Sequence, residues 1–220
     1  MAVYRKSGPG ELPEGAVLIA EKEAVTYQWK LINDWTPVKD VWPFKFGVGI
    51  LGGSSVLSAV YINNHYRKKL KLHNFGKFSS FIPSVVLPVV MSSIFHTQFI
   101  TNDIIIGKTL CPVCVELRAA GIQSLFSTVY PCIMAPFAAA SFATRYYTYK
   151  VPSLLHNPKA ALQLWMKFTR PIGNTLFGMC VLQAIVAMTV TYYEAKAHFK
   201  IQNELIRQEH EYEQQHRALY

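Results

Sequence analysis

The chain has 220 residues, of which 51% are hydrophobic, and it carries a formal net charge of +9. A basic chain can bind nucleic acid, but here the basic excess is confined to two short segments between apolar stretches, which argues against nucleic acid as a partner. Because about 90 residues lie in stretches without a charged side chain, too few remain for a separate soluble domain of ordinary size.

Residues 1–45 are predicted to form an extramembrane segment. Within it, Ala16–Trp35 carries apolar residues at three- and four-residue spacing, which predicts a short amphipathic helix. We expect this helix to lie at the membrane interface or against the rest of the protein. A docking helix for a partner is the alternative interpretation.

Four long stretches without Asp, Glu, Lys or Arg follow in the chain. They are Phe46–Ile62, Phe78–Asn102, Ala119–Thr144 and Pro171–Tyr193. A helix rises ~1.5 Å per residue, so about 20 apolar residues cross the ~30 Å hydrocarbon core of a bilayer. The sequence therefore predicts an all-α polytopic membrane protein, a bundle of four transmembrane helices, with spans at about 44–63, 79–101, 119–143 and 171–193.

Glycine and proline are placed distinctively in these spans. Gly49 and Gly53 form the small-xxx-small pattern that lets helices approach closely in lipid. We expect them to pack against another helix of the same bundle, and the alternative is a face for another membrane subunit. Pro83 and Pro88 each remove a helical hydrogen bond and are expected to kink the second span.

The connectors between the spans differ in charge. The first, Asn63–Lys77, and the third, Arg145–Arg170, each contain five basic residues and no acid. Basic short loops stay on the side from which insertion is resisted, so these connectors are expected inside and both termini outside. Residues expected there, near anionic lipid headgroups, are Arg67, Lys68, Lys69, Lys71, Arg145 and Lys150.

Residues 194–220 are predicted to form a charged helical tail that continues the fourth span. This segment carries four basic and five acidic residues. Lys200 and Glu204 are spaced for an ion pair on its surface. The mixture of signs favours a helix that is solvated all round.

Cys111-Pro-Val-Cys114 in the second connector is the most reactive-looking motif. Residues three apart on a helical turn are close enough for a disulfide, and Arg118 could share their helical face and stabilise a thiolate. A structural or redox-responsive disulfide and a pair of reduced, packed cysteines both remain open. A zinc site is disfavoured because it needs four ligands.

Polar side chains within or beside the spans are few, and most such groups simply form hydrogen bonds across helices. They are His96, Gln98, Gln123, Asn174 and Gln183. A proton- or ion-coupled transporter would be expected to have a charged residue in a span core, and these cores have none. With no phosphate-binding glycine loop, HExxH, GxSxG or paired carboxylates, we expect no enzymatic activity, catalytic residue, metal or cofactor.

The order and spacing of several residues resemble those of a known family. The run Cys111-x-x-Cys114-x-x-x-Arg118 is followed by Gly121, Tyr130-Pro131, Arg145-Tyr146, Trp165, Pro171 and Gln183. Together with Pro83 and Pro88, this pattern resembles the transmembrane protein 126 family. The likeness covers roughly residues 83–193, whereas the first ~75 residues and the tail are less similar.

The resemblance implies a multi-pass protein of the mitochondrial inner membrane without catalytic activity. It further implies a role as an assembly factor or chaperone for respiratory complex I, with membrane-arm subunits and other assembly factors as partners. The basic connectors would then face the matrix, and the termini and the cysteine pair would face the intermembrane space. Two alternatives remain: a permanent accessory subunit of a respiratory-chain complex, and a redox-responsive membrane protein using Cys111 and Cys114.

Overall fold

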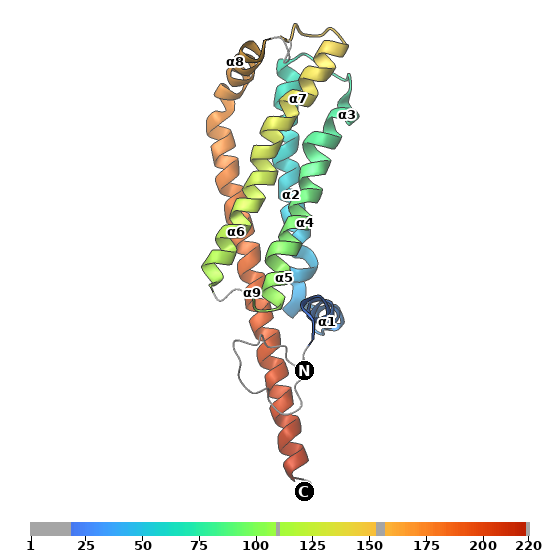
Figure 1. The fold of residues 1–220 in the computed structure, drawn as a ribbon, viewed down its shortest axis with the longest axis vertical. Helices are drawn as coiled ribbons and strands as arrows, with labels where there is room; N and C mark the ends of the chain where they lie inside the picture. Colours follow the sequence, from blue (N-terminus) through green and yellow to red (C-terminus); the bar gives the residue numbers. More distant parts are fainter. Residues whose placement is uncertain (1–18, 109–110, 153–156, 219–220) are drawn as a thin grey trace.

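The computed structural model describes residues 19–108, 111–152 and 157–218, and these residues form an elongated bundle of helices (Figure 1). Four helical stretches among them are long and apolar enough to cross a membrane: Val38–Lys69, Lys77–Ile105, Pro112–Arg145 and Pro158–Tyr212. The predicted all-α class with four candidate spans is confirmed. Residues 1–18, which include the start of the predicted amphipathic helix, lie outside the described residues.

The first stretch is α2 (Val38–Lys69), preceded by α1 (Glu21–Asp34). The second stretch consists of α3 (Lys77–Phe81), η1 (Ile82–Val86), α4 (Leu87–His96), η2 (Thr97–Thr101) and α5 (Asn102–Ile105). The third consists of α6 (Pro112–Ser124), η3 (Leu125–Val129) and α7 (Tyr130–Arg145). The fourth lies in α8 (Pro158–Thr169), the 3₁₀ turn η4 (Arg170–Ile172) and the greater part of α9 (Gly173–Ala218).

Three segments of the described chain are π-helical, and two of them end shortly before a proline of the spans. The segment η1 ends two residues before Pro88, and η3 ends two residues before Pro131. Proline has no backbone N–H and its ring collides with the carbonyl of the preceding turn. A wider π turn accommodates this defect without ending the helix. The third segment, η2, lies beside a buried polar cluster described below.

Helix α2 lies in the middle of the bundle and packs against α4, α7 and α9. One contact layer joins Ile62 and Tyr66 of α2 to Ala135, Ala139 and Ala143 of α7, all fully buried. Alanines four residues apart share one helix face, and their small side chains let the two backbones approach closely. Helix α6 runs along α9 on another side of the bundle.

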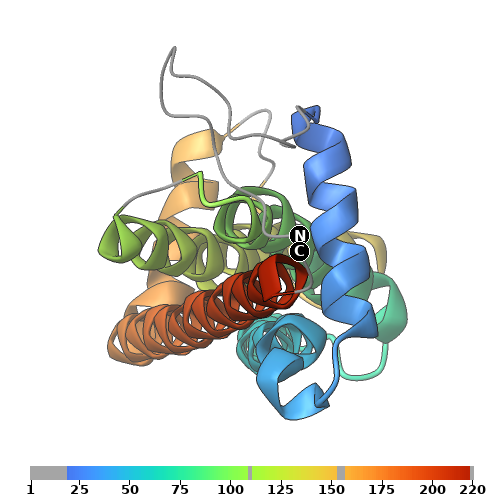
Figure 2. The same ribbon diagram turned by 90° about the horizontal axis from the view of Figure 1, so that it is seen from below.

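Helix α1 lies across one end of the bundle, roughly perpendicular to the long helices (Figure 2). Its Ile32 is buried in an apolar cluster with Phe44 of α2 and Ile105 of α5. The indole Nε1 of Trp29 donates to Asn102 Oδ1 at 3.0 Å. The amphipathic face of this helix is therefore covered by the bundle, which is one of the two positions expected from the sequence.

The first part of the charged tail differs from the prediction. Ala197, Ile201 and Leu205 of α9 are buried against α1 and the start of α2, so the helix is not solvated all round. Lys200 pairs with Asp40 of α2 at 2.7 Å rather than with Glu204. These three apolar residues are four apart in the sequence, but the charged residues between them led to the prediction of a solvated helix. The last part of α9 projects past the bundle (Figure 1).

Helix α8 was not predicted, because its residues were assigned to a basic connector. It begins after Asn157 with Pro158 at its first turn, a favoured position for proline. The indole Nε1 of Trp165 on this helix donates to Cys132 O on α7 at 3.3 Å. The Thr169 Oγ1 lies 2.7 Å from the Tyr66 hydroxyl on α2. These contacts attach α8 to the end of the bundle opposite α1 (Figure 1).

Candidate functional site

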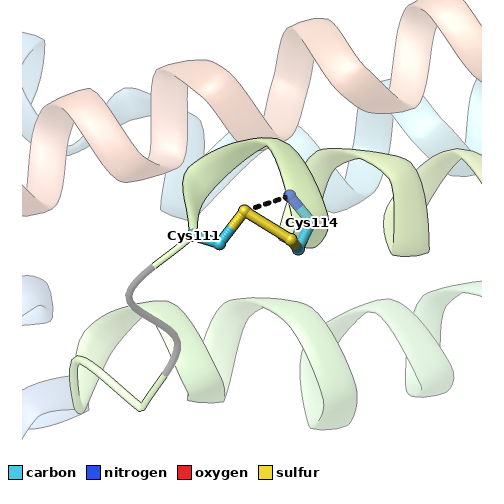
Figure 3. The surroundings of a disulfide bond; sticks show 2 residues. All are labelled: Cys111 and Cys114. Carbon is cyan, nitrogen blue, oxygen red and sulfur yellow. Dashed lines mark hydrogen bonds between the residues drawn. A yellow bond between two sulfur atoms is a disulfide. The ribbon is translucent and has the colours of Figure 1, made fainter.

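The start of α6 carries a disulfide between Cys111 and Cys114 (Figure 3). Their α-carbons are 5.4 Å apart. Cys111 is the N-cap residue of α6, and its Sγ accepts a hydrogen bond from the backbone N–H of Cys114 at 3.3 Å. Pro112 occupies the first helical position, where its missing N–H costs nothing. The sequence of the motif thus places one sulfur of the pair at the positive end of a helix.

The disulfide is open to its surroundings, and both of its residues are exposed. Two large apolar side chains next to it are exposed as well, Val113 at 66% and Leu117 at 67%. Arg118, which was expected to stabilise a thiolate, donates instead to Asp103 Oδ2 on α5 at 2.7 Å. The positive charge is therefore committed to a carboxylate, and helix α6 itself supplies the polar stabilisation of the Cys111 sulfur.

The glycines of α2 face in two different directions. Gly49 and Gly53 are exposed, and a β-carbon at either position would have open space around it. Gly47 is buried, and a β-carbon there would lie 2.9 Å from Val190 Cγ1 and 3.3 Å from Glu194 Oε1 on α9. The expectation that Gly49 and Gly53 pack inside the bundle is wrong. Gly47 makes the close contact, and the small-xxx-small pair faces outward.

Replacing Gly47 by alanine is expected to destabilise the protein, whereas the same change at Gly49 is expected to be neutral or stabilising. Alanine is favoured over glycine in a helix by ~0.5–1 kcal/mol, and only at Gly47 must Val190 shift to admit the methyl group. Thermal unfolding of both variants in the same detergent would measure the difference. Equal midpoints would show that α2 and α9 do not approach as closely as described.

A network of hydrogen bonds centred on Gln123 joins α2, α4, α6 and α9 through uncharged side chains and one backbone carbonyl. Gln123 Nε2 donates to Leu51 O at 3.0 Å, Ser55 Oγ at 2.9 Å and Gln183 Oε1 at 2.9 Å. Its Oε1 accepts from Ser92 Oγ at 2.6 Å. Each such bond within a membrane contributes ~0.6 kcal/mol on average, so the network fixes the relative register of the helices.

A second buried cluster contains a carboxylate. Glu194 is 0% exposed, and its two oxygens lie 3.4 Å from His96 Nε2 of α4. Thr101 Oγ1, at the end of η2, donates to Glu194 Oε2 at 3.2 Å. Nδ1 of His96 has no hydrogen-bond partner among the described residues. The cluster thus joins the second and fourth candidate spans by polar contacts inside the bundle.

Sequence reasoning missed Glu194 because it follows the last residue of the fourth apolar stretch and was assigned to the solvated tail. The expectation that no charged residue lies in a span core, which disfavoured a coupled transporter, therefore missed a buried carboxyl group just beyond the fourth predicted span. The signal in the sequence was His96, an ionisable side chain inside an apolar stretch that needs a polar partner. The structure supplies that partner from a helix about one hundred residues later.

Comparison with known proteins identifies the family of this fold. The family described as transmembrane protein 126 matches residues 27–211. The chain belongs to the transmembrane protein 126 family. This match confirms the resemblance and extends it to the second half of α1, to α2 and to most of the tail.

Two relatives show how far the family similarity reaches. Transmembrane protein 126 of Drosophila melanogaster is 42% identical over 217 residues, which cover 98% of this chain and 97% of the relative. Transmembrane protein 126A of Rattus norvegicus is 18% identical over 143 residues, 65% of this chain and 70% of the relative. No solved structure matches the chain.

Arg67 is one of the basic residues that were expected in a loop near lipid headgroups, but it is buried instead. It is 4% exposed, in the last turn of α2. Its guanidinium donates to the carbonyls of His73, Phe75 and Gly76 and to Ser80 Oγ, at 2.8–3.3 Å. Arg67 therefore holds the turn between α2 and α3 together and cannot contact lipid headgroups.

The other basic residues remain available at the surface. Lys68, Lys69, Lys71, Arg145 and Lys150 are all exposed. They lie where α2 and α7 end, at the same end of the bundle (Figure 1). Helix α1, the start of α6 and the projecting part of α9 lie at the other end. The first and third connectors are thus separated from the cysteine pair by the length of the bundle.

Proposed function

We propose that this chain is a non-catalytic assembly factor of the mitochondrial inner membrane that accompanies subunits of the membrane arm of respiratory complex I. Membership of the transmembrane protein 126 family supports this role, because the resemblance implied it from the sequence. The basic end of the bundle would face the matrix, and α1 and the cysteine pair would face the intermembrane space. Exposed lysines at the basic end would bind anionic headgroups.

The outward-facing glycines of α2 carry the proposal. Gly49 and Gly53 leave open space beside the helix, and exposed apolar residues border them. These residues are Phe46, Ile50 and Leu57. A glycine pair four residues apart allows a second membrane helix to approach the backbone closely. The face is therefore suited to hold an apolar helix of a subunit that has not yet reached its final partner.

Replacing Gly49 and Gly53 together by leucine is expected to impair complex I assembly while leaving this protein folded. The side chains would project into open space and not into the bundle, so only the approach of a partner helix would be blocked. Every 1.4 kcal/mol of lost contact weakens binding about tenfold. Complexome profiling of cells that express only the variant should show less mature complex I and accumulated membrane-arm intermediates.

Gly178→Leu provides the matched control, because Gly178 is an exposed glycine of α9 that also has open space around it. This variant should support normal assembly. Normal complex I with the Gly49/Gly53 double variant would contradict the proposed contact. Stoichiometric presence of the protein in mature complex I would show a permanent accessory subunit instead of an assembly factor.

A further inference from the structure

We infer that the Cys111–Cys114 disulfide is a thiol–disulfide exchange site that oxidises a dithiol in an apolar protein segment. This redox activity goes beyond the proposed non-catalytic role in complex I assembly and does not depend on it. The inference rests on three features of the start of α6: the exposure of the disulfide, the hydrogen bond at Cys111, and the apolar side chains beside Cys114.

The exposure of both cysteines gives an incoming thiolate access to the disulfide. A disulfide that serves only to hold a fold is usually covered, whereas exposed ones are more readily reduced and exchanged. This one joins residues only three apart, within the first turn of a helix that is already hydrogen-bonded. Opening it would therefore leave α6 and its packing on α9 in place.

The environment of the two sulfurs is unequal, and this sets the direction of attack. Cys111 Sγ accepts the N–H of Cys114 and lies at the positive end of α6 (Figure 3). Both features stabilise a thiolate on Cys111. The better leaving group is the sulfur whose thiolate is more stable, so attack takes place on Cys114 and expels Cys111.

Exposed apolar side chains lie on the same side of the helix as the attacked sulfur. Leu117 follows Val113 by four residues and Cys114 by three, so these three side chains are neighbours on α6. Because Val113 and Leu117 are each about two-thirds exposed, they form an apolar contact surface beside Cys114. This surface favours a protein segment with apolar side chains next to its thiol over a small polar thiol.

The exchange balances in two steps. A thiolate of the partner attacks Cys114 Sγ, a new S–S bond forms, and the electron pair of the broken bond leaves on Cys111 Sγ, held by the N–H of Cys114. The partner's second thiol, after losing its proton to water, attacks its own first sulfur and expels Cys114, which takes up a proton. Cys111 also takes up a proton from water, so the partner dithiol is oxidised to a disulfide and the cysteine pair is reduced to two thiols. Exchange with glutathione disulfide would return the pair to the oxidised state.

The test uses the purified full chain in lipid nanodiscs and a synthetic peptide with two cysteines flanked by leucines. We expect one peptide disulfide per protein chain. A version of the peptide with one cysteine should stop at the mixed disulfide, and mass spectrometry should place it on Cys114. Reaction only after the protein is unfolded, or attachment of the peptide to Cys111, would overturn the inference.

Leu117→Gln tests the contact surface without disturbing the core, because Leu117 is exposed. We expect this variant to react with the leucine-flanked peptide about tenfold more slowly, the effect of losing one apolar contact, while its reaction with glutathione stays unchanged. Leu162→Gln, a change at an exposed leucine of α8, serves as the control and should match the original chain. Equal rates for both variants with the peptide would refute the docking of an apolar segment.

Discussion

Replacing His96 by leucine is expected to lower the stability of the protein by about 3 kcal/mol, because removing one side chain of a buried polar pair leaves the other without its partner. Glu194 is fully buried, and of the residues that the structure describes only Thr101 would still donate to it. Replacing Glu194 alone by leucine is expected to cost less, since an imidazole without a partner is easier to bury than a carboxyl group without one. Unfolding in a denaturing-detergent titration would measure both effects.

The double variant His96→Leu/Glu194→Leu is expected to be more stable than the His96 variant alone, because replacing both polar partners by apolar groups can be nearly neutral. Glu211→Leu is the control, since it removes an exposed carboxylate from the same helix. Additive losses in the double variant would show that the two side chains do not interact. A stable His96 variant would mean that Glu194 has another partner.

Replacing Arg67 by methionine is expected to have an effect of similar size, localised to the turn between α2 and α3. Arg67 satisfies three backbone carbonyls and the Ser80 hydroxyl. Each buried acceptor left without a partner costs about 1–3 kcal/mol, although water entering the turn would offset part of this loss. Limited proteolysis should then cut the turn much faster than in the original chain.

Lysine at position 67 should not rescue the turn. An ammonium is a compact charge with three donors, whereas the planar guanidinium reaches acceptors on several sides at once. Lys68→Met is the control, because Lys68 is the exposed neighbour on the same helix turn. If Arg67→Met and Lys68→Met are cut at the same rate, the guanidinium does not organise the turn.

The number and type of the spans could be predicted because hydrophobicity alone determines them. A stretch of about 20 uncharged residues has few other stable environments. The ends of the helices were less predictable, since they depend on backbone capping and not on the end of the apolar run. Helix α6 begins at Pro112, seven residues before the third predicted span, because proline and the Cys111 cap favour a helix start there.

The orientation of side chains around each helix could not be read from the sequence. Gly47, Gly49 and Gly53 are the same residue type on one helix. Gly47 makes the close contact only because α9 packs on its side of α2. In the same way, Arg67 and Lys68 are adjacent basic residues at a helix end, yet one is buried and the other exposed. Such differences depend on contacts between segments that are distant in the chain.

Helix α9 is unbroken over 46 residues, so at a rise of ~1.5 Å per residue it is ~69 Å long, more than twice the thickness of the hydrocarbon core. Its outer part is a stiff rod that is held to the bundle through Ala197, Ile201 and Leu205. A protein that binds the helix near Tyr212 would be held at a defined distance, ~10 Å along the axis beyond Leu205. A twist applied to the helix there would be transmitted along its axis. Binding in the aqueous compartment would therefore move the part of α9 that lies within the membrane.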